Sequence, residues 1–137
     1  MKIGQKIWKI DINKPVSGTI YSSQEEGIFI KELEILGINS CNLVLNDEWF
    51  TTFPLKNESR KSWETYLDDI SVRIYTNESF VANGVFITLH STKKPSKKLL
   101  DKMVATACTE IDKKYGFLFG GVKSDIHSIV DNFNFAR

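Results

Sequence analysis

The chain has 137 residues, 42% of them hydrophobic and 26% charged, and a formal net charge of +1 at pH 7. This length and balance are typical of one globular domain, so we expect a single domain over residues 1–137. No apolar run approaches the roughly 20 residues that span a bilayer, and no apolar segment of signal-peptide length follows the N-terminus. We therefore expect a cytoplasmic protein with no membrane partner.

The first half of the chain is rich in segments with the two-residue period of β-strands. Residues 6–12 place Trp8, Ile10 and Ile12 on one side, which is typical of a half-buried strand. Polar turns separate this segment from those that follow it. We expect further strands over residues 18–22, 28–36, 41–45, 49–53, 71–75 and 85–89.

The segment at residues 28–36 changes phase along its length. Ile28 and Ile30 share one parity, whereas Leu33 and Ile35 share the other. A β-bulge near Lys31-Glu32 would turn all four side chains inward, and we expect one there. A helix is the alternative, but the β-branched residues and the flanking glycines favour a strand.

The longest helix is expected at about residues 96–115. Leucine, methionine, valine, alanine and isoleucine side chains recur there with a period of 3.6 residues, and lysines and acids fill the other face. Pro95 ends the preceding strand, Ser96 can cap the first free N–H groups, and Gly116 can close the helix.

Two shorter helices are expected, at about residues 58–69 and about 124–133. Both have apolar residues at positions i, i+3, i+4 and i+7, and Ser124 would cap the second one. Strands followed by helices predict an α+β fold. We expect a mainly antiparallel sheet packed by the long amphipathic helix and the two shorter ones.

Charge is distributed unevenly along the chain. Residues 1–92 carry 9 basic and 12 acidic side chains, and residues 93–137 carry 9 basic and 5 acidic ones. The acids of the first half would hold a basic partner protein if they gathered on one face. Scattered surface charge is the simpler interpretation. The candidate partner-binding residues are Glu25, Glu26, Asp47, Glu48, Asp68, Asp69 and the loop aromatic Phe80.

Lysines crowd the start of the predicted long helix. A positive helix start with free N–H groups is a plausible anion or phosphate site. A solvated helix end is the alternative, because no aromatic residues interleave the lysines as in a single-strand binder. The candidate anion-binding residues are Lys93, Lys94, Lys97, Lys98 and Lys102.

Catalytic and metal-binding patterns are weak in this sequence. His90 and His127 are the residue types for acid–base chemistry, and Ser124, Asp125 and Cys41 complete the set of reactive groups. Each member of the Ser124–His127 segment also has an ordinary role at a helix start. No zinc-ligand spacing and no phosphate-loop motif occurs, so we expect no metal and no cofactor.

These observations favour a small non-enzymatic protein-binding protein of bacterial type. The specific hypothesis is an immunity or inhibitor protein that binds and neutralises a toxin or enzyme, and the acidic residues favour a basic one. The alternative is a nucleic-acid or phosphate-ligand binder that uses the lysine cluster, and salt-sensitive binding would support it. A small hydrolase that uses His90 or His127 is a third hypothesis, and a homodimer formed through a sheet edge also stays open.

Overall fold

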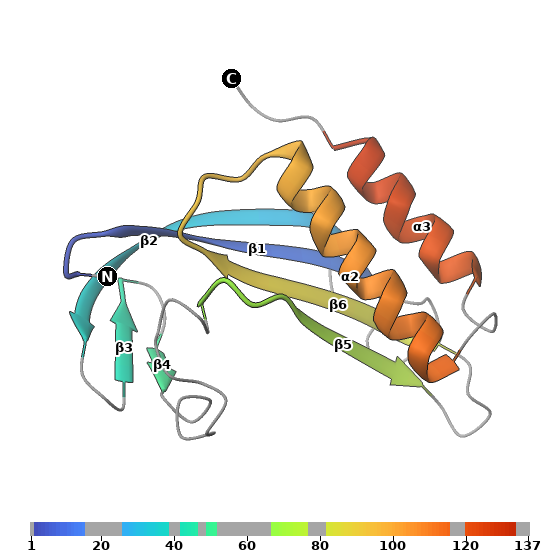
Figure 1. Ribbon diagram of the computed structural model, residues 1–137, viewed down its shortest axis with the longest axis horizontal. Coiled ribbons are helices and arrows are strands. Elements are labelled where there is room, and N and C mark those ends of the chain that lie inside the picture. The colour runs from blue at the N-terminus through green and yellow to red at the C-terminus, as the bar shows by residue number, and fades with distance from the viewer. Residues whose placement is uncertain are drawn as a thin grey trace.

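The computed structural model describes residues 2–15, 26–38, 42–46, 49–51, 67–76, 82–115 and 120–133. The strands in these ranges are β1 (Lys6–Pro15), β2 (Gly27–Ile38), β3 (Asn42–Leu45), β4 (Trp49–Thr51), β5 (Ser71–Thr76) and β6 (Ala82–Ser91). They form one sheet in the order β4-β3-β2-β1-β6-β5, and neighbouring strands are antiparallel. The helices are α2 (Lys97–Tyr115) and α3 (Gly120–Asp131). The predicted α+β fold with an antiparallel sheet is confirmed (Figure 1).

β1 is the central strand and sets the two sides of the sheet. It pairs with β2 and with β6, so Ile10 lies between Ile30 and Leu89, and Ile12 lies between Ile28 and Ile87. Cross-strand partners point to the same side. The even-numbered residues of β1 therefore share the side that the helices cover.

The main core lies between the sheet and the two helices. α2 contacts β5 and β6, whereas α3 contacts β1 and β2 (Figure 1). The helices close this core with apolar side chains spaced three and four residues apart. Its buried residues are Ile10, Ile12, Val85, Ile87, Leu89, Leu100, Met103, Val104, Ala107, Ile111, Ile126 and Val130.

A second, smaller core lies on the opposite side of the sheet. Ile7 and Leu33 are cross-strand partners at odd-numbered positions of β1 and β2, on the side opposite the helices, and both are buried. Figure 1 shows β3 and β4 running in a different direction from β1, so that the sheet curls at this end. The buried residues of this core are Ile7, Leu33, Ile35, Leu43, Leu45 and Leu67.

The two cores explain the phase change in β2, and the bulge predicted near Lys31-Glu32 is wrong. The register between β1 and β2 runs without a shift from the pair Lys6–Glu34 to the pair Asn13–Gly27. The irregularity lies between Ile35 and Gly37, where β2 pairs with β3. The strand needs no bulge at its centre because Ile28 packs on the main core, whereas Leu33 and Ile35 are buried in the second core on the opposite side.

The long helix predicted at about residues 96–115 is confirmed by α2. Ser96 caps it as expected, because its Oγ accepts a hydrogen bond from the Leu99 N–H at 3.2 Å. Lys113 and Lys114 lie in its last turn, where the helix dipole favours positive charge. Neither α2 nor α3 is long and apolar enough to cross a membrane.

The shorter helices differ from the prediction. The helix expected at 124–133 starts earlier, at Gly120, so Ser124 lies inside α3 and does not cap it. The earlier start lets Val122 pack on the main core and Lys123 pair with α2. The helix expected at about 58–69 is not matched: the described residues contain only two helices, and residues 58–66 lie outside them.

Candidate functional site

The helices cover only part of the sheet, and β2 extends beyond them. With a rise of about 3.3 Å per residue, the 12 residues of β2 span roughly 40 Å. α3, the helix that contacts β1 and β2, has 12 residues and is about 18 Å long at 1.5 Å per residue. One end of β2 is thus left without a helix above it (Figure 1).

Exposed apolar side chains lie along β2 and beside its uncovered end. In the described part of the chain, the large hydrophobic side chains with high exposure are Ile3 (65%), Leu36 (50%) and Ile30 (38%). Ile30 and Leu36 belong to β2. Ile3 is held beside it, because the N–H of Gly4, at a φ of 91°, donates a hydrogen bond to the carbonyl of Ile35 at 2.8 Å.

Four residues follow one another at every second position along β2, Ile30, Glu32, Glu34 and Leu36, which we name the β2 stripe. Strand alternation places Ile30, Glu32 and Glu34 on one side, while Leu33 and Ile35 are buried on the other. Leu36 lies at the irregularity between Ile35 and Gly37 and is exposed there. The stripe lies on the helix-covered side of the sheet, because Ile28 at its near end packs against the main core.

β1 supplies the flank of the stripe. Trp8 is half-buried and lies opposite Glu32, and Lys6 lies opposite Glu34. The Lys6 Nζ is 3.1 Å from the Glu34 Oε1, so that carboxylate is paired within the chain. Glu32 is exposed and makes no ion pair with any residue that the structure describes. The surface therefore combines apolar side chains, one indole and a net negative charge.

The sequence-predicted acidic residues do not gather with one another. Glu26 pairs with Lys14 at 2.6 Å, beside the start of β2. Asp68 accepts hydrogen bonds from the N–H and hydroxyl of Thr92, at the far end of β6. Lys14 is the cross-strand partner of Val85, seven residues before Thr92, so these two sites are separated by about 23 Å along the sheet. Asp69 directly follows Asp68. Glu25, Asp47, Glu48 and Phe80 lie outside the described residues.

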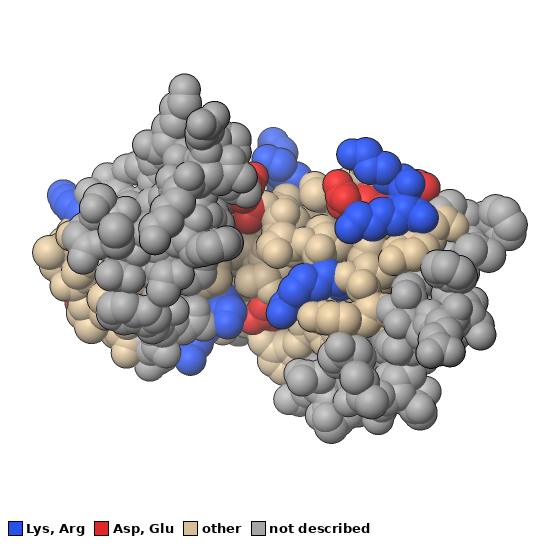
Figure 2. Space-filling view, turned by 90° about the horizontal axis from the view of Figure 1, so that it is seen from below, with Lys and Arg blue, Asp and Glu red and all other residues tan. Residues whose placement is uncertain are grey.

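The lysine cluster is partly neutralised by neighbouring acids. Lys97 lies 2.7 Å from Asp101 and 3.3 Å from Asp131, and the hydrogen bond to Asp101 is the main cause of its raised pKa. The cap from Ser96 already occupies one free N–H of α2. Among the side chains drawn in colour in Figure 2, basic and acidic groups are interspersed. The remaining lysines of the cluster, all exposed, are Lys93, Lys94, Lys98 and Lys102.

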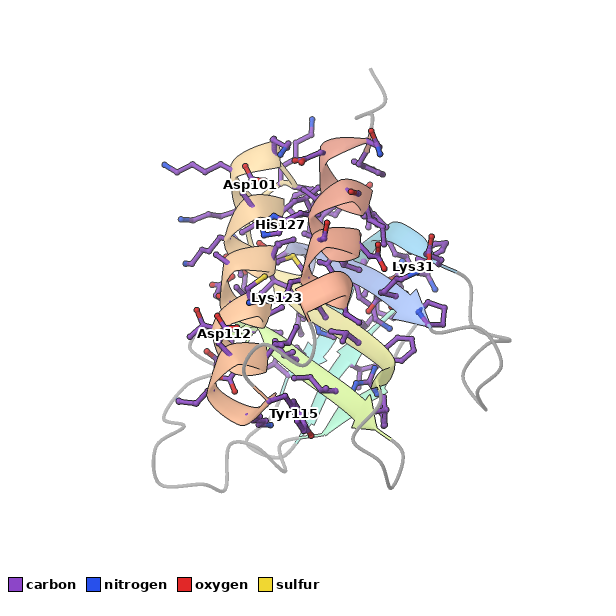
Figure 3. The ribbon with its side chains drawn as sticks, turned by 90° about the vertical axis from the view of Figure 1, so that its right-hand side faces the viewer. Lys31, Asp101, Asp112, Tyr115, Lys123 and His127 are labelled. Carbon is purple, nitrogen blue, oxygen red and sulfur yellow. The ribbon has the colours of Figure 1, made fainter. Side chains whose placement is uncertain are left out.

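A polar seam joins α2 to α3, and sequence reasoning missed it. The Cys108 Sγ lies 3.7 Å from the His127 Nε2, and one turn away Lys123 pairs with Asp112 at 2.5 Å (Figure 3). Cys108 and Asp112 are four residues apart on α2, and Lys123 and His127 are four residues apart on α3. Side chains at this spacing lie on the same face of a helix. Only the antiparallel packing of the helices shows that the two spacings meet.

The chemistry of this seam is structural. Burial raises the pKa of the Cys108 thiol, with Lys123 opposing that shift and Asp112 adding to it. A reactive cysteine needs a lowered pKa, as at a helix N-terminus, whereas Cys108 lies well inside α2. The described residues contain no group of three or more side chains that could hold a metal ion. The pair therefore lacks the features of a nucleophile or a metal centre.

The two histidines lie on different sides of the sheet and do not form an acid–base pair. His90 is the cross-strand partner of Lys9 and shares the side opposite the helices with Lys31, which Figure 3 shows across the sheet from His127. His127 lies on α3. Asp125, another candidate reactive group, is 3.8 Å from Lys14. Cys41 lies outside the described residues.

Comparison with protein-family models, with curated proteins and with solved structures finds no significant match. The β2 stripe is the arrangement that sequence reasoning missed, because Ile30 was expected in the core and Leu36 was not singled out. The sequence signal was an apolar residue, Leu36, at an even-numbered position of a segment whose odd-numbered residues Leu33 and Ile35 are also apolar. This signal can be interpreted only when it is known which part of the sheet the helices cover.

Proposed function

We propose that this chain is a small non-enzymatic protein-binding protein of the immunity or inhibitor type, which neutralises a toxin or enzyme in the cytoplasm. The observation that carries this proposal is the exposure of Ile3, Ile30 and Leu36 on and beside one strand, β2. Single exposed apolar side chains are ordinary on protein surfaces. Three of them along one strand, with charged side chains between them, favour a protein-interaction surface.

The placement of the reactive side chains supports a non-enzymatic role. Cys108 has a raised pKa and contacts His127 within a helix seam, Asp125 pairs with Lys14, and His90 lies on the other side of the sheet. These groups do not converge on one reacting point, which acid–base or nucleophilic catalysis requires.

The alternative, a nucleic-acid or phosphate-ligand binder, has less support. It needs the positive charge and the free N–H groups at the start of α2. Lys97 has two carboxylate partners, and Ser96 occupies the Leu99 N–H. The four other lysines of the cluster are exposed to solvent, as is usual at the start of a surface helix.

A pull-down with the full chain tests this proposal. The tagged chain is incubated with lysate of its source cells and washed at low and at moderate salt, and both protein and nucleic acid are analysed. We expect one stoichiometric protein whose own activity falls when the purified chain is added. Nucleic acid that leaves as the salt concentration rises, or no bound protein at all, contradicts the proposal.

A further inference from the structure

We infer that the β2 stripe is the contact surface for the partner, and that the partner presents basic side chains between two apolar anchors. This inference rests on the proposed function and names its surface and its partner's chemistry. It starts from the order of residues along the stripe, which is apolar, acidic, acidic, apolar.

The spacing of the stripe sets the spacing of the partner's groups. Ile30 and Leu36 are six residues apart, which is about 20 Å along a strand. Both are exposed, and the two glutamates lie between them. A complementary surface has two apolar side chains about 20 Å apart, with Lys or Arg between them to meet the carboxylates.

The charges of the stripe favour a basic partner. The Glu34 carboxylate is already paired with Lys6, whereas the Glu32 carboxylate has no ion pair among the described residues and lies beside the half-buried Trp8. A Lys or Arg of the partner placed at Glu32 would therefore gain an ion pair without breaking one between described residues.

A second copy of this chain fits the stripe poorly. Two copies laid antiparallel along the stripe would place Glu32 against Glu34, and two parallel copies would place each acid against itself. Like charges directly opposed are destabilising. The occupant is thus a different protein with basic groups.

Binding by designed variants tests the inference. The partner obtained with the wild-type chain is purified, and its dissociation constant is measured for wild type, Leu36→Ser and Glu32→Lys. We expect Leu36→Ser to weaken binding roughly tenfold, because an apolar anchor is lost. Glu32→Lys should weaken binding at least tenfold in low salt and less in high salt. The control, Glu110→Lys, makes the same charge change on α2 and should alter binding less than about twofold.

The outcomes separate this inference from the proposed function. Unchanged binding by Leu36→Ser and Glu32→Lys, with native circular dichroism for both, overturns the inference and leaves the proposed function standing. Sedimentation that shows a wild-type dimer which Leu36→Ser abolishes also overturns it, because the occupant is then a second copy. Failure to obtain any protein partner overturns the proposed function itself.

Discussion

Alanine substitutions at Leu33 and Ile30 test whether β2 serves two cores on opposite sides of the sheet. The two residues lie three positions apart on one strand and have opposite parity. Leu33 is 1% exposed in the second core, and Ile30, the cross-strand partner of Ile10, is 38% exposed. If a central bulge turned both inward, the two substitutions would have similar effects.

The structure predicts clearly different losses of stability. Leu33→Ala removes a fully buried side chain and leaves a closed cavity, which lowers the free energy of unfolding by about 2–5 kcal/mol. Full burial of an isoleucine contributes about 1.5–3 kcal/mol, and Ile30 is only partly buried with water able to fill the space. We therefore expect Ile30→Ala to lower the free energy of unfolding by about 1 kcal/mol.

Urea unfolding followed by circular dichroism and by tryptophan fluorescence measures both losses. The midpoint should shift much further for Leu33→Ala than for Ile30→Ala, with similar slopes for the two variants and wild type. Coincident transitions by both probes justify a two-state analysis. Equal losses, or a larger loss for Ile30→Ala, would refute the two-core arrangement and restore the bulge.

Two further predictions concern a close contact and the helix seam. Gly84→Ala should lower the free energy of unfolding by about 1–3 kcal/mol, because the added Cβ would lie 2.8 Å from the ring of the buried Phe86. In a Phe86→Leu background this loss should be smaller. An equal loss in both backgrounds contradicts the prediction. In a Cys41→Ser chain, burial raises the pKa of Cys108, so iodoacetamide at pH 8 should alkylate it more slowly than free cysteine. Asp112→Asn should lower that pKa and speed the reaction, as a pH–rate profile would show, and a slower reaction contradicts the assignment.

Local patterns were sufficient to predict α2. Its 3.6-residue period, the Ser96 cap and the two lysines of its last turn are all encoded within 20 residues, and the helix has the expected bounds. The start of α3 was misplaced because a serine is a strong capping signal. Packing of Val122 and the pairing of Lys123 with Asp112 favour the longer helix.

The candidate site could not be predicted from local patterns, because it depends on strand order. The sequence contains the acids of the first half but does not say which are neighbours. The sheet separates Glu26 from Asp68 and gives each a partner on another element, Lys14 and Thr92. It also places Glu32 beside Trp8, a residue 24 positions earlier in the chain, which no short-range pattern could indicate.

The exposed apolar residue at position 36 is a consequence of the second core. Leu33 and Ile35 must point away from the helices to pack with β3, and strand alternation then turns Glu34 to the helix-covered side. Leu36 follows at the irregularity between Ile35 and Gly37 and is 50% exposed. α3 is too short to reach that end of β2, so no element among the described residues buries Leu36. A serine at position 36 would keep the same alternation and both cores. The leucine therefore has no packing role that the described structure requires, which is why binding is the property that its replacement should change.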